Sequence, residues 1–166
     1  MHIAFSIIFT ILLTIANGYF SMSEMALSTA KKVLLDHEAE EGDVRAAIAS
    51  AAVENPSRFL AAIQVAITLL GFFSSAFAAT SLSEPFGAWM ESFGMDAGAS
   101  RSVATVIITL IVSYFSTVVG ELVPKRIAMA DAEAVAKEVA GPINGFSTFA
   151  RPLVVLTAST ANAVAR

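Results

Sequence analysis

Oxygen-bearing residues recur at intervals of three or four within three apolar stretches of the chain. In the first stretch these residues are Asn17, Ser21, Glu24 and Ser28. In the second they are Gln64, Thr68, Gly71 and Ser75. In the third they are Thr109, Ser113, Ser116 and Gly120, with Thr117 and Glu121 beside them. Such spacing places side chains on one face of an α-helix, so each stretch is predicted to carry a polar face.

Lipid does not solvate hydroxyls and carboxylates, so the three polar faces are predicted to turn towards each other. Their ligand atoms are all oxygens, which suit Mg²⁺, Ca²⁺ or Na⁺ better than zinc or copper. The chain has no cysteine, and its two histidines, His2 and His37, are too few for a histidine-rich zinc site. The residues therefore predict an oxygen-lined site for a hard cation.

The segment Gly120–Lys125 is predicted to interrupt the third helix. Pro124 has no N–H, so the carbonyl of Gly120 loses its helical partner and is expected to be free beside the Glu121 carboxylate. Asn17 and Gly18 are expected to weaken the first helix ahead of Ser21. Interrupted helices that expose carbonyls are a recurring means of binding small cations in transporters.

Other readings of these residues remain open. The hydroxyls and glycines could serve only close helix packing. Glu24 could lie at the cytoplasmic interface in contact with water, and Glu121 could pair with Lys125 four residues later. A carboxylate inside a membrane, however, marks an ion or substrate path by default.

The elements that carry these residues are predicted from charge and length. The chain is 56% hydrophobic and 14% charged, with a mean hydropathy of +0.72. Stretches of 21, 25 and 19 residues without Asp, Glu, Lys or Arg follow His2, Arg58 and Arg101. Each is close to the roughly 20 residues that cross a bilayer. We predict one all-α membrane domain over residues 1–166, with spans at about 3–23, 59–82 and 102–122.

The connecting segments are predicted to be helical too. Residues 27–54 are expected to form cytosolic helices, and Asn55 and Pro56 to start the second span. Residues 131–165 are split by Arg151 and Pro152, which predicts kinked, re-entrant or surface helices. The first apolar run lacks a basic leader and a cleavage site, so it is predicted to be retained as a span.

The distribution of Lys and Arg predicts the orientation. Four lie in residues 27–58, one in 81–101 and five after residue 122. The positive-inside rule then places the C-terminus in the cytoplasm of a plasma (inner) membrane protein, with the N-terminus outside.

Four segments resemble the CNNM/CorC transmembrane domain family, often labelled hemolysin-related. The family's first-helix motif is similar to residues 17–26, NGYFSMSEMA. The start of its second span resembles residues 54–60, ENPSRFL, and a second-span motif of one bacterial branch resembles residues 64–71, QVAITLLG. The end of its third span is similar to residues 120–125, GELVPK. The four segments occur in the family's order over essentially the whole chain, which makes the resemblance specific.

The resemblance implies transport of divalent cations, chiefly Mg²⁺ efflux, with Na⁺ as a candidate coupling ion. It also implies a homodimer with three spans per subunit. The family's metal ligands carry over to Ser21 and Glu121, and Ser23 and Glu24 lie in the same motif. Many members have asparagines where this chain has Ile67 and Gly71, so Thr68 is expected to substitute in part. Full-length relatives continue into a paired CBS module that binds adenine nucleotide, and the present sequence stops about where that module would begin.

Together these arguments predict a magnesium transporter domain that works by alternating access, not an enzyme. The expected metal ligands are Ser21, Ser23, Glu24, Thr68, Gly71, Gly120 and Glu121. The alternative is a membrane anchor that dimerises, carries a cytosolic regulatory partner and transports nothing. A membrane enzyme is disfavoured because the sequence has no Ser/His/Asp set, no HExxH and no phosphate loop.

Overall fold

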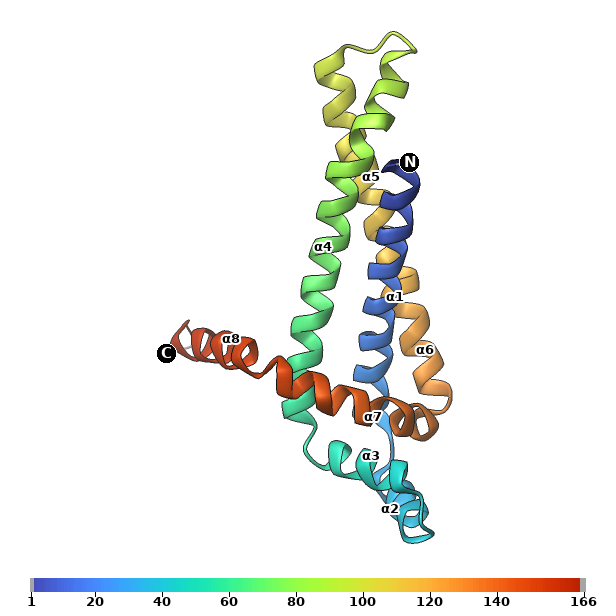
Figure 1. Ribbon diagram of the computed structural model, residues 1–166, viewed down its shortest axis with the longest axis vertical. Coiled ribbons are helices and arrows are strands. Elements are labelled where there is room, and N and C mark those ends of the chain that lie inside the picture. Colours follow the sequence, from blue (N-terminus) through green and yellow to red (C-terminus); the bar gives the residue numbers. More distant parts are fainter. Residues whose placement is uncertain (1, 165–166) are drawn as a thin grey trace. The chain divides into compact units, whose positions relative to one another are not determined.

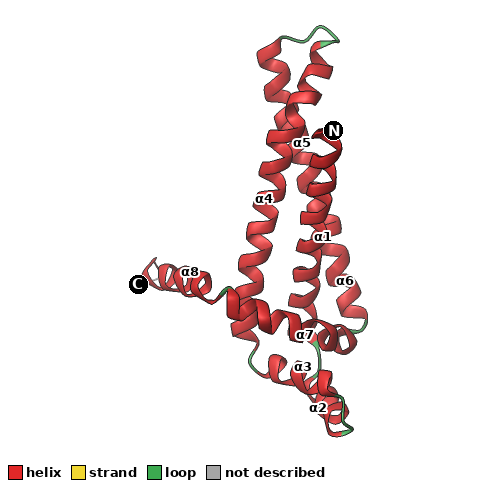
Figure 2. Cartoon of the chain, in the orientation of Figure 1, coloured by secondary structure: helices red, strands yellow, loops and turns green. Residues whose placement is uncertain are grey.

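Helices form all the regular elements of the computed structural model, which describes residues 2–164 (Figures 1 and 2). Three helical stretches are long and apolar enough to cross a membrane: Ile3–Thr29, Pro56–Glu91 and Ala97–Ala130. The prediction of an all-α membrane protein with three spans is therefore confirmed.

The first span, α1 (His2–Thr29), runs without a break through Asn17 and Gly18. The predicted weakening at these two residues stays a prediction, but it does not interrupt the helix. A glycine inside a helix costs only about 1 kcal/mol relative to alanine. That is too little to interrupt a long helix whose other residues favour the same conformation.

The second span, α4 (Pro56–Glu91), starts where the sequence predicts, with Pro56 in its first turn. A turn containing Gly94, at a φ of 92°, leads from α4 to α5 (Ala97–Thr117). The Asp96 carboxylate caps α5 by accepting hydrogen bonds from the N–H groups of Gly98 and Ala99 at 3.0 and 3.3 Å.

The third span changes its pitch instead of breaking. A π-helical turn, η1 (Val118–Leu122), joins α5 to α6 (Val123–Ala130). Pro124 cannot donate a backbone hydrogen bond, and a widened turn just before it lets the helix continue. Wide turns of this kind are found frequently at functional sites.

The chain divides into two units, and the first comprises residues 1–18 and 68–123. Here the rings of Phe9 on α1 and Phe77 on α4 meet edge to face with centroids 4.7 Å apart. Near the turn, the Ser100 hydroxyl donates to the Glu91 carboxylate at 2.9 Å. α4 and α5 lie close together at Gly87, where a Cβ would be in ordinary van der Waals contact with the Arg101 Cα at 3.4 Å.

The second unit comprises residues 19–67 and 124–166. It contains α2 (Lys32–Glu40), α3 (Val44–Glu54), α7 (Ala132–Phe149) and α8 (Arg151–Val164). The buried side chains of Leu27, Leu35, Ile63, Val139 and Ile143 form its core. The segments predicted as cytosolic and as surface helices are thus helical, and residue 165 lies outside the described residues.

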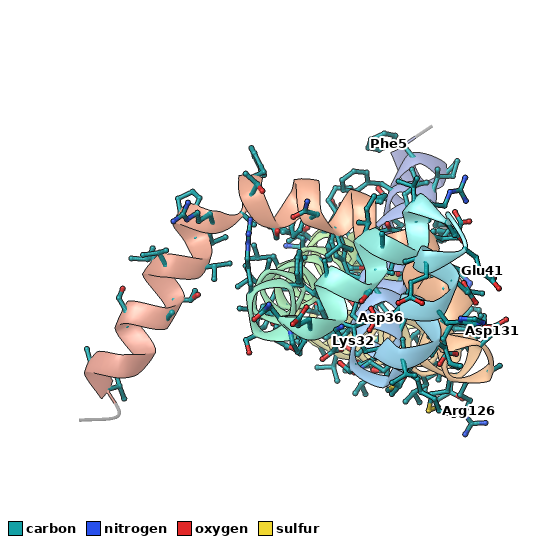
Figure 3. All side chains as sticks on the ribbon, turned by 90° about the horizontal axis from the view of Figure 1, so that it is seen from below. Phe5, Lys32, Asp36, Glu41, Arg126 and Asp131 are labelled. Carbon is teal, nitrogen blue, oxygen red and sulfur yellow. The ribbon has the colours of Figure 1, made fainter. Side chains whose placement is uncertain are left out.

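Charged side chains tie α2 and α3 to α7. Arg45 pairs with Glu138, and Lys137 contacts Glu38 at 2.5 Å and Asp43 at 3.5 Å. Within α2, Lys32 pairs with Asp36 at 2.8 Å, and Figure 3 shows these two residues close together. This part of the second unit is therefore held by ion pairs as well as by its apolar core.

The predicted inward faces are found in the first and third spans but not in the second. Asn17 and Ser21 are buried on α1, and Ser116 and Gly120 are buried along the third span. On α4, Gln64 and Thr68 are exposed, whereas Ser74 is fully buried. Small side chains at Ser74 and Ala78 allow close helix contact, so helix packing selects a different face of α4 from the one predicted.

Candidate functional site

Ser21 is the most unusual polar residue of the first span. Its side chain is fully buried, and its hydroxyl oxygen has no hydrogen-bond partner among the described residues. Ser23, also fully buried, donates to the carbonyl oxygen of Tyr19 at 2.7 Å, as serines in helices commonly do. A buried polar group without a partner costs free energy, so the Ser21 hydroxyl is a natural position for a ligand.

Glu24, one turn after Ser21, forms an ion pair with Lys125. The carboxylate oxygen and the ammonium nitrogen are 3.1 Å apart, and both side chains are about one quarter exposed, at 27% and 23%. Glu24 is therefore neutralised by a cation of the protein and is not only in contact with water. Its predicted role as a metal ligand stays a prediction.

Asn17 connects the first span to the widened turn of the third. Its side-chain Nδ2 donates a hydrogen bond to the carbonyl oxygen of Gly120 at 3.0 Å. The prediction that this carbonyl is free is therefore wrong, because the amide of Asn17 occupies one of its two acceptor positions. The other oxygen of the amide, Oδ1, is buried and has no partner among the described residues.

The contact also explains why residue 120 is a glycine. A Cβ at this position would lie 3.2 Å from Asn17 Nδ2, from Thr14 Cγ2 and from the Thr14 carbonyl oxygen. Those distances are shorter than ordinary van der Waals contact, so only glycine brings the two spans this close without displacement. The neighbouring Glu121 is half-buried within the same turn.

The second-span candidates, Thr68 and Gly71, lie on a more open face. Thr68 is exposed, Gly71 is half-buried, and no heavy atom lies within 4 Å of a Cβ built on Gly71. Gly120, by contrast, is buried and lies against Asn17. Ser21, Ser23 and Glu24 are adjacent on α1.

Sequence reasoning missed part of the polar face of α1. Ser6, Thr10 and Thr14 are buried and extend the line that continues through Asn17 and Ser21. Thr10 donates to the Ser6 carbonyl at 2.8 Å, and Thr14 donates to the Thr10 carbonyl at 3.0 Å. The same spacing of three and four residues could have identified them. Ser74, whose buried hydroxyl has no partner among the described residues, carried no such signal.

The buried candidate ligands are mainly neutral oxygens. Within residues 2–164, no three His, Cys, Asp or Glu side chains come together as a metal cluster. In the first unit, the Asn17 amide oxygen is buried and the Glu121 carboxylate lies in the widened turn. In the second unit, the Ser21 hydroxyl is buried. Hard cations are bound by such groups.

Comparisons with known proteins identify the family of this chain. The model of the cyclin M transmembrane N-terminal domain (CNNM) matches residues 7–166. A UPF0053 protein of Synechocystis is 33% identical over 158 residues, which are 95% of this chain and 35% of that protein. Polyamine export proteins of Haemophilus influenzae and Escherichia coli are 26% and 27% identical, covering 98% and 97% of this chain and 37% and 36% of theirs.

The chain thus spans about a third of the length of these relatives. The family model covers nearly all of the chain, including the three spans, the widened turn and the helices that follow. The protein therefore belongs to the family of cyclin M transmembrane N-terminal domains.

Proposed function

We propose that this domain transports a cation across the membrane, with Mg²⁺ as the first candidate and efflux as the direction. The observation that carries the proposal is the Ser21 hydroxyl, which is fully buried in a membrane-spanning helix and has no partner among the described residues. In a helix that serves only as an anchor, this hydroxyl would be expected to donate to a carbonyl of its own helix, as Ser23 does.

In this proposal, Ser21 and Glu121 are the principal ligands of the transported ion. Thr68 and the carbonyls of Gly71 and Gly120 add neutral oxygens. The site opens to one side of the membrane at a time, and the charge of Glu121 biases that change when the cation or a counter-ion such as Na⁺ binds. Glu24 is paired to Lys125 and therefore adds little net charge.

Export of an organic polycation is a second candidate. Similar proteins of Haemophilus influenzae, Salmonella typhimurium and Escherichia coli carry the name polyamine export protein. In addition, Ile67 offers no oxygen, and Gly71 offers only its carbonyl. Mg²⁺ demands a nearly octahedral set of oxygens, whereas an alkylammonium group needs only a few acceptors and a carboxylate. The second span offers few oxygen ligands, which suits an alkylammonium group better than Mg²⁺.

A vesicle experiment distinguishes these possibilities. The chain is reconstituted, and flux is measured with a magnesium-sensitive dye in one arm and labelled putrescine or spermidine in the other. We expect wild-type flux of at least one cation, and its loss in Glu121→Gln and Ser21→Ala. The control is Glu40→Gln, because Glu40 is exposed on α2.

Absence of any cation flux from wild-type vesicles would favour the anchor alternative. Flux that survives both Glu121→Gln and Ser21→Ala would instead refute the ligand assignment. Each variant is first shown to insert and to melt cooperatively, so loss of flux is not confused with misfolding.

We also propose that the chain forms a homodimer in the plasma membrane. A cytosolic CBS-type module, which the family resemblance implies for longer relatives, is its proposed partner. The support for the dimer is the resemblance to the family and the apolar side chains that α4 exposes in the single chain, among them Phe72 and Phe73. Cross-linking in membranes and mass measurement in detergent test this part of the proposal.

A further inference from the structure

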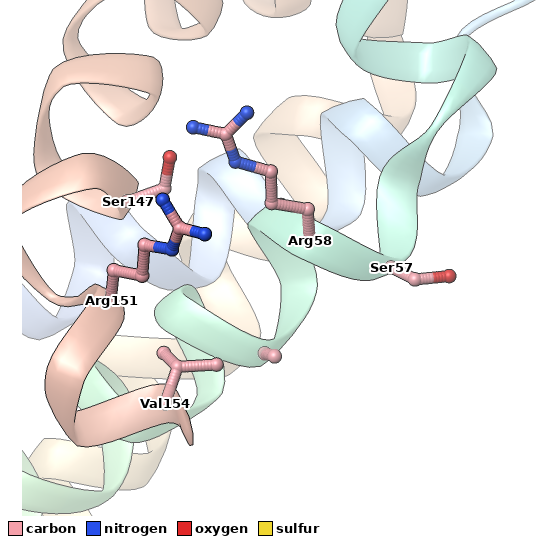
Figure 4. Close-up of a pocket in the computed structure, with 6 residues that line it drawn as sticks. Ser57, Arg58, Ser147, Arg151 and Val154 are labelled. Atoms are coloured by element: carbon pink, nitrogen blue, oxygen red, sulfur yellow. The ribbon is translucent and has the colours of Figure 1, made fainter. Parts of the chain in front are cut away.

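Two arginines of the second unit line a common pocket. Arg58 lies in the first turns of α4 and Arg151 begins α8, and both guanidinium groups point into the space between these helices (Figure 4). The pocket has a volume of about 460 Å³ and is completed by Ser57, Ala61, Ser147 and Val154. All six residues belong to the second unit.

Neither arginine is neutralised within the described chain. Lys32, Arg45 and Lys137 of the same unit each form an ion pair with a carboxylate, whereas no described Asp or Glu pairs with Arg58 or Arg151. Arg58 Nη2 donates only a long hydrogen bond, of 3.4 Å, to the hydroxyl of Thr148. Two like charges that share a pocket repel each other, and an anion between them removes that cost.

The surrounding groups select a phosphate. Guanidinium groups bind phosphate oxygens through paired hydrogen bonds. The Ser147 hydroxyl already donates to the Asn144 carbonyl, so the two arginines are the principal donors of the pocket. The amino ends of α4 and α8 also lie here and contribute partial positive charge. The pocket therefore presents two full charges and two helix dipoles to one ligand.

The position of the pocket indicates that the phosphate belongs to a lipid. Arg58 directly precedes 25 residues without a charged side chain, so the pocket lies where α4 meets the end of its apolar stretch. On α8, Leu153, Val155 and Leu156 are exposed, as is Phe149 at the end of α7. Ala61 and Val154 provide an apolar wall for the glycerol and the first carbons of an acyl chain.

We propose that Arg58 and Arg151 bind the phosphate of an anionic phospholipid headgroup. The lipid fixes α8 against the start of α4, with the apolar side chains of α8 towards the hydrocarbon. This inference stands independently of the transported ion, because it uses none of the candidate ligand residues.

The test measures the melting temperature of the purified 166-residue chain in a neutral detergent. Short-chain phosphatidylglycerol, short-chain phosphatidylcholine and inorganic phosphate are titrated separately. We expect phosphatidylglycerol to raise the melting temperature of the wild type more than the other two. Each of Arg58→Gln and Arg151→Gln should weaken this response about fivefold, and the double variant should abolish it.

The matched control is Arg126→Gln, because Arg126 is exposed and lies outside the pocket (Figure 3). An equal response in the double variant and in this control would overturn the proposal. An equal effect of inorganic phosphate and phosphatidylglycerol would overturn the assignment to a lipid. If Arg58→Gln fails to fold, Arg151→Gln alone decides, because Arg151 makes no ion pair with the described residues.

Discussion

Asn17 shows how one side chain can determine the distance between two membrane spans. Its amide binds the Gly120 carbonyl, and its other oxygen is buried without a partner. Asn17→Ala should lower the free energy of unfolding by about 1 kcal/mol, because it leaves a buried carbonyl without this donor. Thermal melting in detergent measures the change. The control Ser102→Ala removes an exposed hydroxyl that bonds only within α5, and we expect it to melt like the wild type.

Gly120 is predicted to be the least replaceable glycine of the third span. Gly120→Ala would place a methyl group 3.2 Å from Thr14 and Asn17 and should destabilise the protein by about 1–3 kcal/mol. Gly145→Ala is the matched control, since nothing lies within 4 Å of its Cβ and alanine favours the helix. We expect the two variants to change the melting temperature in opposite directions. A stabilising Gly120→Ala would contradict the close approach described above.

At the scale of elements, hydrophobic length predicted the spans and local patterns predicted several helix ends. The Asn55–Pro56 boundary and the break at Arg151 follow from the chemistry of proline. The widened turn could not be read from the sequence, because Pro124 predicts a disturbance but not whether the helix breaks or changes pitch. The sequence analysis also predicted the wrong buried face of α4. It used the spacing of hydroxyl groups, whereas Ser74 and Ala78 are buried because they are small.

The α2–α3–α7 cluster should lose stability in acid. Hydrogen bonds from Lys32, and then from Ser50, lower the pKa of Asp36. The backbone N–H of Ala46, followed by that of Arg45 and the charge of Lys137, lowers the pKa of Asp43. Both carboxylates therefore favour the folded state fully above their ordinary pKa of about 3.9, and this contribution disappears as the pH falls through their lowered values.

Hydrogen exchange of α2 and α3 at decreasing pH measures this effect. We expect protection to fall below about pH 4 in the wild type and to depend less on pH in Asp36→Asn. Glu40→Gln, which changes an exposed carboxylate on α2, should follow the wild type. An unchanged pH profile in Asp36→Asn would show that this ion pair does not couple folding to protonation.

For the whole molecule, the predicted topology can be tested directly because the chain contains no cysteine. A cysteine at position 92, in the turn after α4, should react with a membrane-impermeant maleimide on intact cells. A cysteine at position 40, on α2, should react only after the membrane is opened. The reverse pattern would invert the orientation deduced from Lys and Arg, and the cysteine-free parent provides the blank.

The order of motifs along the chain identified the family, but single residues did not identify the site. Ser21 was selected from the periodic polar face of the first span and from the family motif, and its side chain is buried as that face predicts. Thr68 was selected from spacing alone and is exposed in the single chain. Burial depends on neighbours that are distant in sequence, and spacing within one helix does not contain that information.

The widened turn has one further consequence. A single amide-to-carbonyl bond of about 1 kcal/mol favours the joined state of α1 and η1 over a separated one by only about fivefold. A cation that took the Gly120 carbonyl as a ligand would compete with the Asn17 amide for the same oxygen. Binding of a cation to this carbonyl would then remove one of the contacts that hold α1 against η1.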